Sequence, residues 1–324
     1  MTSGPGRPLI SVLFPDQPTS GGDIVAFGKI VRDSGATRLW LGQALRIESH
    51  PALAYLAGAG CRIPVGIGVS LMVLRHPYDA AVQARSLAAL MEHPVTVGYG
   101  AADPRFVRSL IGAPYARPAS AVEEYVTIMR ALLRGEHVTR RGGLFEVDQE
   151  LPPLTHPPVE VGAGVLRPTM ARAAGRSADA AMTWLCPPNY LSRTILPALR
   201  AGAQDRNAVP RVVAVVPVAV DRPGRSAFLL AQHGAFNHLR TAHYTDMLRR
   251  AGLDLDASDP VSGARELVEE GVYVYGKPGD IADGVRRYHE AGVGEVVLNL
   301  VAVANLHGQA EAIRDLSQIL AELS

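Results

Sequence analysis

The feature that most constrains the fold is a regular alternation of short apolar runs with segments of helical pattern along the 324 residues. Several of these runs show too little polar alternation for a half-exposed sheet, which is typical of parallel strands covered on both faces. Alternation of this kind predicts β/α units, and we expect an α/β fold, a (β/α)₈ TIM barrel, as one domain over residues 1–324. The eight predicted strands are residues 9–14, 37–41, 65–69, 95–98, 159–162, 178–183, 212–220 and 295–300.

Helix start signals fall between these predicted strands. Ser49 followed by Pro51 predicts an N-cap and a proline in the first turn. Ser120 with Glu123 predicts a capping box that opens a long helix. Residues 278–291 begin with proline and end before a glycine, so they are expected to form the last helix before the eighth strand.

Two connections are much longer than an ordinary β/α loop, namely residues 99–158 and 221–294. Insertions of this length usually hold extra helices and functional lids. Active sites of such barrels lie at the C-terminal ends of the strands, where these insertions start. The second insertion carries a cluster that we expect to be a solvated helix face, with a substrate-sensing lid as the alternative: His233, His238, His243 and Tyr244.

Composition excludes several classes of partner. The 32 basic and 31 acidic residues are scattered along the chain, so no basic stripe is available for nucleic acid. No apolar stretch approaches the ~20 residues that span a bilayer, and no signal peptide is evident, so we expect a cytoplasmic protein without a membrane partner. Cys61 and Cys186 lie far apart without other metal ligands at suitable spacing, and we expect reduced core thiols and no metal site.

Seven segments carry a further signal in their order and spacing, although no single segment is decisive. They are LWLGQ (39–43), GIGVSLMVLRHP (66–77), VGYG (97–100), EEYVTIMRALLRGEHV (123–138), VEVGAG (159–164), AGRSADAAMTW (174–184) and GKPGDIADGVRRYHEAGVGEVVL (276–298). Together they resemble the luciferase-like monooxygenase superfamily, in particular its coenzyme F420-dependent oxidoreductase branch. This resemblance covers most of the chain and implies hydride transfer to or from C5 of a deazaflavin.

The resemblance also implies where the coenzyme lies. In the family, a non-proline cis peptide at the end of the third strand forms a bulge behind the central ring, whereas an ordinary strand end is the alternative here. Glycines at the end of the fourth strand leave backbone open to close approach of a ligand. The coenzyme contacts expected at these two strand ends are Gly68, Val69, Ser70, Leu71, Gly98, Tyr99 and Gly100.

Five further coenzyme contacts are expected at and after the fifth and sixth strands. The fifth strand ends in glycines just before a helix, where backbone N–H groups could meet a phosphate; a tight turn with a solvated arginine is the alternative. An aromatic residue closes the sixth strand and packs either against the coenzyme or substrate or as core filler. The residues are Gly162, Ala163, Gly164, Arg167 and Trp184.

One position departs from related enzymes. Gln43 ends the second strand where sugar-phosphate dehydrogenases of this class have an acidic residue followed by histidine, and here Ala44 follows. Oxidation of an alcohol needs a base for the hydroxyl proton, so we expect reduction of an activated C=C or C=N bond. The Gln43 amide could hydrogen-bond the deazaflavin edge or a substrate carbonyl, with a capped strand end as the alternative.

Three other residues are considered as proton donors. His50 and Glu48, in the loop after the second strand, are the nearest titratable side chains that could protonate the substrate carbon, and the alternative for His50 is that it only opens a helix. Tyr99 is the second candidate, because a phenol at the barrel mouth would be an available proton source. His76 matches a family element that starts a helix, and we expect a structural role for it.

The resemblance thus implies an F420-dependent reductase or dehydrogenase acting on a small organic or peptide substrate, in keeping with relatives in secondary metabolism. We expect a homodimer, since barrels of this class usually pair through helices. An FMN-dependent luciferase-like monooxygenase is the first alternative, because the same fold accepts reduced FMN and oxygen. A non-catalytic flavin-binding barrel is the second.

Overall fold

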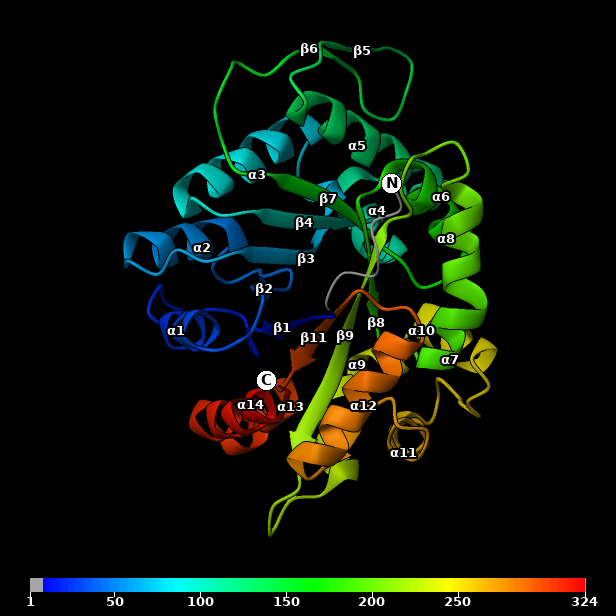
Figure 1. The fold of residues 1–324 in the computed structure, drawn as a ribbon. Coiled ribbons are helices and arrows are strands. Elements are labelled where there is room, and N and C mark those ends of the chain that lie inside the picture. The colour runs from blue at the N-terminus through cyan, green and yellow to red at the C-terminus, as the bar shows by residue number, and fades with distance from the viewer. Residues whose placement is uncertain (1–7, 324) are drawn as a thin grey trace.

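The structure of the protein, a computed structural model, describes residues 8–323. Eight parallel strands form a closed ring with helices around it (Figure 1), and the ring closes through the pairing of β8 with β9. The predicted (β/α)₈ barrel is therefore confirmed. In ring order, the strands are β9 (Arg211–Val220), β11 (Glu295–Asn299), β1 (Leu9–Leu13), β2 (Leu39–Leu41), β3 (Val65–Leu71), β4 (Val95–Gly100), β7 (Val159–Gly164) and β8 (Ala180–Trp184).

All eight predicted strands are present, with differences only at their ends. Strands β4 and β7 each continue two residues further than predicted, to Gly100 and Gly164. Strand β3 continues to Leu71 across an irregularity, where its pairing with β4 shifts register between Ile67 and Ser70. The peptide bond between Gly68 and Val69 is cis, as the resemblance implied.

Helices fill the connections on the outside of the ring. Two predicted starts are wrong, by one and by three residues. Helix α2 (Ser49–Gly58) is capped by Glu48, whose carboxylate accepts from the N–H of His50. Helix α5 (Pro118–Leu133) starts at Pro118, because a proline suits the first turn, so the predicted capping box at Ser120 and Glu123 is absent. The last predicted helix is confirmed as α12 (Pro278–Glu290).

The helices that flank the ring or cover its ends are α1 (Val25–Asp33), α2 (Ser49–Gly58), α3 (Pro77–Met91), α4 (Pro104–Ile111), α5 (Pro118–Leu133), α6 (Pro168–Ser177), α7 (Pro188–Tyr190), α8 (Leu196–Gly202), α12 (Pro278–Glu290), α13 (Val301–His307) and α14 (Gln309–Leu323). Two short irregular turns, η1 (Met72–Leu74) and η2 (Leu191–Ile195), precede α3 and α8. Over residues 8–323, no helix is both long enough and apolar enough to cross a membrane.

Both long insertions contain regular structure of their own. The first holds α4, α5 and an antiparallel pair, β5 (Val138–Arg140) and β6 (Val147–Gln149). The second holds α9 (Ala227–Leu239), α10 (Ala242–Arg250) and α11 (Pro260–Glu269), followed by β10 (Val274–Gly276) and α12. Strand β10 pairs in parallel with the last residues of β9, Val218 to Val220, beyond the part of β9 that pairs within the ring.

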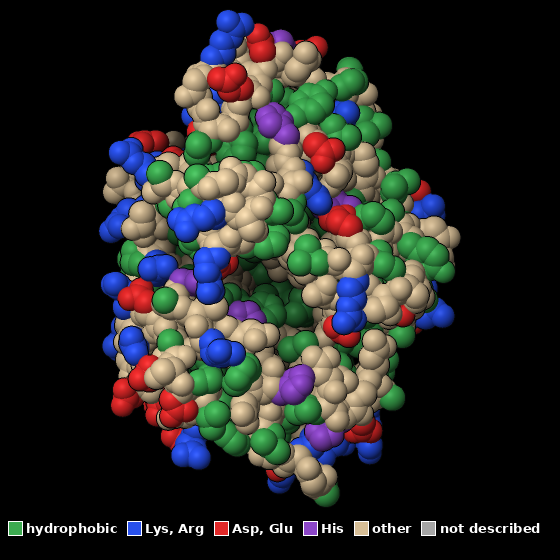
Figure 2. Space-filling view, turned by 180° about the vertical axis from the view of Figure 1, so that it is seen from behind, with side chains coloured by type: hydrophobic (Ala, Val, Ile, Leu, Met, Phe, Trp, Pro, Cys, Tyr) green, Lys and Arg blue, Asp and Glu red, His purple; other side chains and the backbone are tan. Residues whose placement is uncertain are grey.

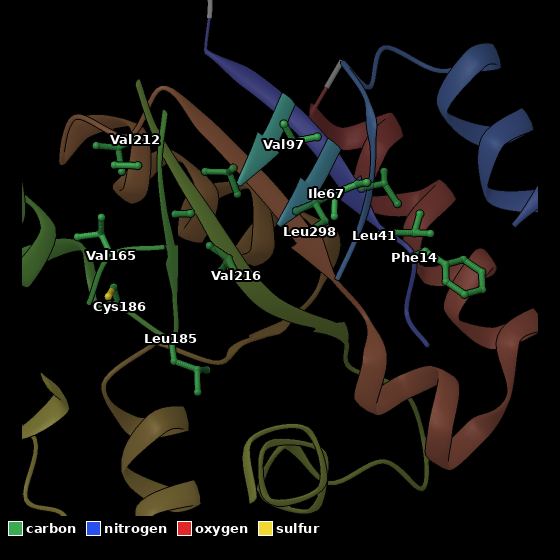
Figure 3. Packing of buried hydrophobic residues seen from close by; sticks show 14 of the residues in the cluster. Phe14, Leu41, Ile67, Val97, Val165, Leu185, Cys186, Val212, Val216 and Leu298 are labelled. Carbon is green, nitrogen blue, oxygen red and sulfur yellow. The ribbon is translucent and has the colours of Figure 1, made fainter. Parts of the chain in front are cut away.

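The core has two parts. The larger part lies between strands and helices and includes both cysteines, which are free and buried as predicted; Figure 3 shows side chains of this part, such as Ile67, Val97 and Cys186. The smaller part, which we call the inner cluster, fills the ring. It consists of Leu13, Trp40, Ala180, Met182, Val213, Val215 and Val297, with Val69 and Trp184 packed against it.

A buried charged network lies where β9 and β11 begin. Glu295, the first residue of β11, is fully buried and accepts hydrogen bonds from Ser11 Oγ at 2.6 Å and Trp40 Nε1 at 2.8 Å. Its carboxylate also pairs with Arg38, at 3.1 Å, and with Arg211, the first residue of β9. Buried charges are tolerated only when they are paired, and here the pairs join the first residues of β9 and β11. We call this end of the ring, opposite the mouth, the closed end.

Candidate functional site

The C-terminal ends of the strands form the mouth of the barrel, and one side of this mouth is lined by glycines. A Cβ atom at Gly162 would lie 2.8 Å from Met182 Cε, so this residue faces the inner cluster. A Cβ atom at Gly100 would lie 3.1 Å from Val69 Cγ2, and one at Gly164 would lie 3.4 Å from Val69 Cγ1. Met182 covers Gly162, which is buried, whereas Val69, Gly100 and Gly164 stay partly exposed and form an apolar surface with little side-chain bulk.

We call this surface the glycine wall and define it as Val69 with Gly98, Gly100, Gly162 and Gly164. Gly98 belongs to it because its missing side chain would collide with Met182. The sequence analysis assigned all five residues to the coenzyme, and the structure brings them together on the inside of the ring. Figure 2 shows one face of the molecule with a hollow near its centre, hydrophobic side chains at the floor, and histidine and basic side chains near the rim.

Gln43 holds the strand end beside the glycine wall. Its Oε1 atom accepts a hydrogen bond from the N–H of Leu71 at 2.9 Å, and its Nε2 atom donates to the carbonyl oxygen of Ala44 at 2.9 Å. A primary amide has two N–H donors, so one remains for a ligand. Ser70, between Val69 and Leu71, is 2% exposed. The side chain of Gln43 thus ties the end of β2 to the bulged end of β3.

Trp184 ends strand β8 and packs against the inner cluster together with Val69. The indole ring stacks on the imidazole of His238, with ring centroids 5.4 Å apart and planes 27° from parallel. The Nε1 atom of Trp184 is buried and has no hydrogen-bond partner among the described residues. Since a buried donor without a partner is costly, this atom is a natural contact for a bound molecule.

Arg167 lies where α6 begins, close to the insertion. It is the residue before Pro168, which has no N–H, and its guanidinium forms a half-exposed ion pair with Asp246 of α10 at 3.4 Å. The N–H of Val165 already donates to the carbonyl oxygen of Met182 at 2.7 Å. A phosphate at this helix start would therefore be held by Arg167 and by N–H groups beyond Pro168.

Tyr99 and Ala163 do not face the ligand side of the strands. Successive side chains of a strand point to opposite faces, so the residues between the wall glycines point outward. Tyr99 is fully buried in the outer core against Tyr125, with ring centroids 4.9 Å apart. Burial raises the pKa of its phenol. The prediction that Tyr99 is an available proton source at the mouth is wrong, and Ala163 offers only its backbone.

His50 lies in the helical layer. It is 7% exposed, and its Nδ1 atom lies 3.0 Å from Glu48 Oε1, to which Arg75 also pairs at 3.3 Å. Burial raises the pKa of Glu48, but hydrogen bonds from His50 and the charges of His50 and Arg75 outweigh burial and lower it to about 2. These three residues line a groove of about 410 Å³ with Leu87 and Leu90 of helix α3. This position gives no support to His50 as the acid at the glycine wall.

His76 has the structural role that the sequence predicted. It precedes α3, its Nδ1 atom accepts from the N–H of Tyr78 at 3.2 Å, and its Nε2 atom lies 3.0 Å from the carbonyl oxygen of Glu146. Over residues 8–323, no three His, Cys, Asp or Glu side chains come together in a way that could hold a metal ion.

The sequence analysis missed the position of His238. Of the predicted solvated cluster, His233 is exposed, whereas His238 is half-buried between Trp184 and Tyr244. Burial, with a smaller effect of His243, lowers the pKa of His238 to about 4. No local pattern could reveal this contact, because Trp184 belongs to a strand that is distant in the sequence.

Similarity to known proteins agrees with this architecture. Among curated relatives, phthiodiolone/phenolphthiodiolone dimycocerosates ketoreductase of Mycobacterium kansasii is 32% identical over 175 residues, which are 52% of this chain and 46% of the relative. The Mycobacterium tuberculosis protein of the same name is 29% identical over 209 residues, 59% of this chain and 53% of the relative. The chain thus spans about half the length of the curated relatives it matches.

Solved structures share the fold at low identity. Coenzyme F420-dependent tetrahydromethanopterin reductase from Methanopyrus kandleri matches with a TM-score of 0.71 and 17% identity, covering 95% of this chain and 99% of that one. An F420-dependent secondary alcohol dehydrogenase with an F420–acetone adduct gives 0.76 and 16%, covering 98% and 99%. A type II Baeyer–Villiger monooxygenase component from Pseudomonas putida with FMN gives 0.69 and 16%, covering 98% of both chains.

A family model decides the assignment. The model of luciferase-like monooxygenases matches residues 11–295, which include all but the first two residues of β1 and the last four of β11, together with the whole glycine wall and Trp184. The chain therefore belongs to the luciferase-like monooxygenase family.

Proposed function

We propose that the protein is a coenzyme F420-dependent oxidoreductase that transfers a hydride between the deazaflavin and a small organic or peptide substrate. The observation that carries this proposal is the glycine wall, with Trp184 packed against the same inner cluster as Val69. Ligand pockets are mostly apolar with a few placed polar groups, and a planar ring needs a surface free of projecting side chains.

The residues present fit such a coenzyme. Gly100 and Gly164 leave little side-chain bulk on either side of Val69, and Gln43 keeps one N–H free. Arg167 supplies a cation for an anionic chain once its ion pair with Asp246 opens. When bound in its reduced form, the deazaflavin would supply a hydride to one atom of the substrate double bond, and a proton would complete the other atom.

The residue after Gln43, just past strand β2, supports the reductive direction. Ala44 takes the place of the histidine base that an alcohol-oxidising relative would need. Tyr99 and His50 do not lie on the glycine wall, so water is the simplest proton source for the second substrate atom. An activated C=C or C=N bond is our proposed acceptor; because the mycobacterial relatives are named ketoreductases, ketones belong in the same panel of test substrates.

Coenzyme choice can be tested by tryptophan fluorescence, since the chain has only two tryptophans, Trp40 and Trp184. Trp40 belongs to the inner cluster and Trp184 packs against it, so both indoles can report a ligand at the mouth. We expect F420 to quench this fluorescence with saturation. Saturable quenching by FMN alone would contradict the proposal.

Turnover separates the remaining alternatives. With reduced F420 and a panel of enones, imines and ketones, we expect coenzyme oxidation that depends on the substrate and proceeds without oxygen. Oxygen uptake with reduced FMN and indifference to F420 would instead identify an FMN-dependent monooxygenase. Tight F420 binding with no turnover of any panel member would favour a barrel that only binds the coenzyme.

We also propose that the protein is a homodimer. Helices α2 and α3 carry exposed apolar side chains, Tyr55 at 53% and Leu90 at 54% exposure, and Leu90 lines the groove that His50 also lines. Exposed apolar patches commonly mark protein interfaces. Light scattering after size exclusion tests this, with Leu90→Arg expected to give monomers if these helices pair; a monomeric wild-type protein would reject the proposal.

A further inference from the structure

Aromatic rings of the second insertion pack against Trp184 at the mouth of the barrel. His238, in the last turn of α9, stacks on Trp184 at 5.4 Å, and Tyr244 of α10 packs edge-on against His238 at 4.8 Å. His243 lies against Tyr244, also at 4.8 Å between ring centroids. The imidazole of His238 is therefore held between a strand of the ring and a helix of the insertion.

Both rings of the stacked pair carry a buried nitrogen without a partner among the described residues. These atoms are Trp184 Nε1 and His238 Nδ1. Unpaired buried polar atoms are uncommon in proteins and call for a specific explanation, such as a ligand or a bound water. Two such atoms on one pair of stacked rings, next to the glycine wall, indicate that the pair contacts a polar group of a bound molecule.

The chemistry of the two nitrogens defines that polar group. An indole N–H can only donate, so its partner must be an acceptor such as a carbonyl oxygen. His238 stays neutral near pH 7, because burial, with a smaller effect of His243, lowers its pKa to about 4. The pKa of His243 is itself lowered by burial and by the charge of Arg167, against a smaller opposite effect of Asp103. A neutral imidazole suits an uncharged oxygen better than a carboxylate or phosphate.

We propose that Trp184 and His238 together bind a carbonyl oxygen of the substrate, so that the acceptor is a double bond conjugated to a carbonyl. This proposal rests on the proposed function, since it places the substrate beside the glycine wall. In this arrangement Trp184 donates through Nε1, and His238 adds a second hydrogen bond through Nδ1 in the tautomer that carries a proton there. His238 is a specificity-determining residue that makes no covalent or acid step.

The direct test is the indole N–H signal of Trp184 in proton–nitrogen correlation spectra of the full chain. Trp40 supplies the internal reference, because its N–H already donates to Glu295 at the closed end, and Trp184→Phe assigns the two signals. We expect cyclohexenone to move the Trp184 proton downfield with saturation and to leave Trp40 unchanged. Cyclohexene, which has the same ring size without oxygen, is expected to give no downfield shift.

Replacing His238 with phenylalanine keeps a stacked ring but removes Nδ1, so this variant measures what the nitrogen contributes to cyclohexenone binding. We expect His238→Phe to weaken cyclohexenone binding about tenfold, as for one lost hydrogen bond, while F420 quenching of the tryptophan fluorescence stays at the wild-type affinity. The exposed His233 gives the matched control, and His233→Phe is expected to change neither.

The outcomes separate the two proposals. If cyclohexenone shifts Trp184 but F420 fails to quench the tryptophan fluorescence, the carbonyl site stands and the coenzyme assignment falls. If F420 binds but no downfield shift occurs at millimolar cyclohexenone, the two nitrogens contact only water and the carbonyl site is rejected. A His238→Phe variant with unchanged cyclohexenone affinity would also reject it.

Discussion

Gln43 fixes the position of Leu71, because its Oε1 atom accepts the backbone N–H of Leu71 at 2.9 Å. The amide of the same side chain donates to the carbonyl oxygen of Ala44. One side chain at the end of β2 therefore positions the bulged end of β3, on which Val69 lies. A residue predicted to contact the coenzyme thus acts largely through the backbone that surrounds it.

Replacing Gln43 with alanine should affect stability and coenzyme binding together. The Leu71 N–H loses its partner, so we expect the free energy of unfolding in urea to fall by about 1 kcal/mol. The affinity for F420, measured by fluorescence, should fall about tenfold because the wall loses its support. Gln318→Ala is the matched control, since Gln318 accepts one hydrogen bond on helix α14. Equal affinities in both variants would contradict this role for Gln43.

Gly164 offers a graded test of the wall. A Cβ atom there would make an ordinary contact with Val69 at 3.4 Å, so Gly164→Ala should fold normally and bind F420 several-fold more weakly. Gly164→Trp should abolish F420 binding, since an indole would fill the ligand side, while circular dichroism shows an intact fold. Gly58→Trp on the exposed end of α2, where nothing lies within 4 Å, is the control. Wild-type affinity in Gly164→Trp would remove the wall from the coenzyme site.

At the opposite end of the ring, Glu295 is expected to matter for stability alone. Glu295→Ala removes the buried carboxylate that pairs with Arg38 and Arg211, which then share only Glu160, and losses of about 3–5 kcal/mol are typical when a buried ion pair is broken. Denaturant unfolding measures the loss, with the exposed Glu290→Ala expected to stay within about 0.5 kcal/mol of wild type. A loss below about 1 kcal/mol would mean that the network contributes little.

Acidic pH should loosen the second insertion through His238. The pKa of His238 is about 4 in the folded protein against an ordinary 6.5, so between these values the unfolded chain binds more protons. Stability should therefore fall as pH drops from 6.5 towards 4, by at most about 3 kcal/mol from this residue. His238→Phe should flatten this part of the pH profile of unfolding, whereas His233→Phe should follow wild type. Identical profiles for all three proteins would show that His238 is not held neutral.

The strands could be predicted because buried parallel strands are nearly continuous apolar runs, bounded by glycine and proline. That the glycines of the wall lie together could be predicted because they stand at the C-terminal ends of neighbouring parallel strands. Tyr99 was misplaced although the alternation in Gly98–Tyr99–Gly100 already sets its ring on the face opposite to both glycines. The strand alternation alone was therefore enough to predict that the side chain of Tyr99 points away from the barrel mouth.

Other features depend on contacts between distant segments. Helices α7 and α8, strand β9 and most of α9 lie between Trp184 and His238 in the sequence, and only the folded chain shows that their rings stack. The ion pair of Arg167 with Asp246 likewise joins two segments that are distant in the sequence. Strand β10 was missed because three residues give no recognisable period, and its partner is the far end of β9.

The pairing of β10 with β9 has a consequence for engineering. The chain leaves the ring after Val220 and returns alongside the same strand at Val274 to Gly276, so the helices between them form an excursion anchored at its base. We expect that the segment from α9 to α11 can be exchanged for that of a relative without altering the order or register of the ring strands. Under the function proposed above, grafting α9 to α11 from a relative is expected to change acceptor preference while the ring stays unaltered.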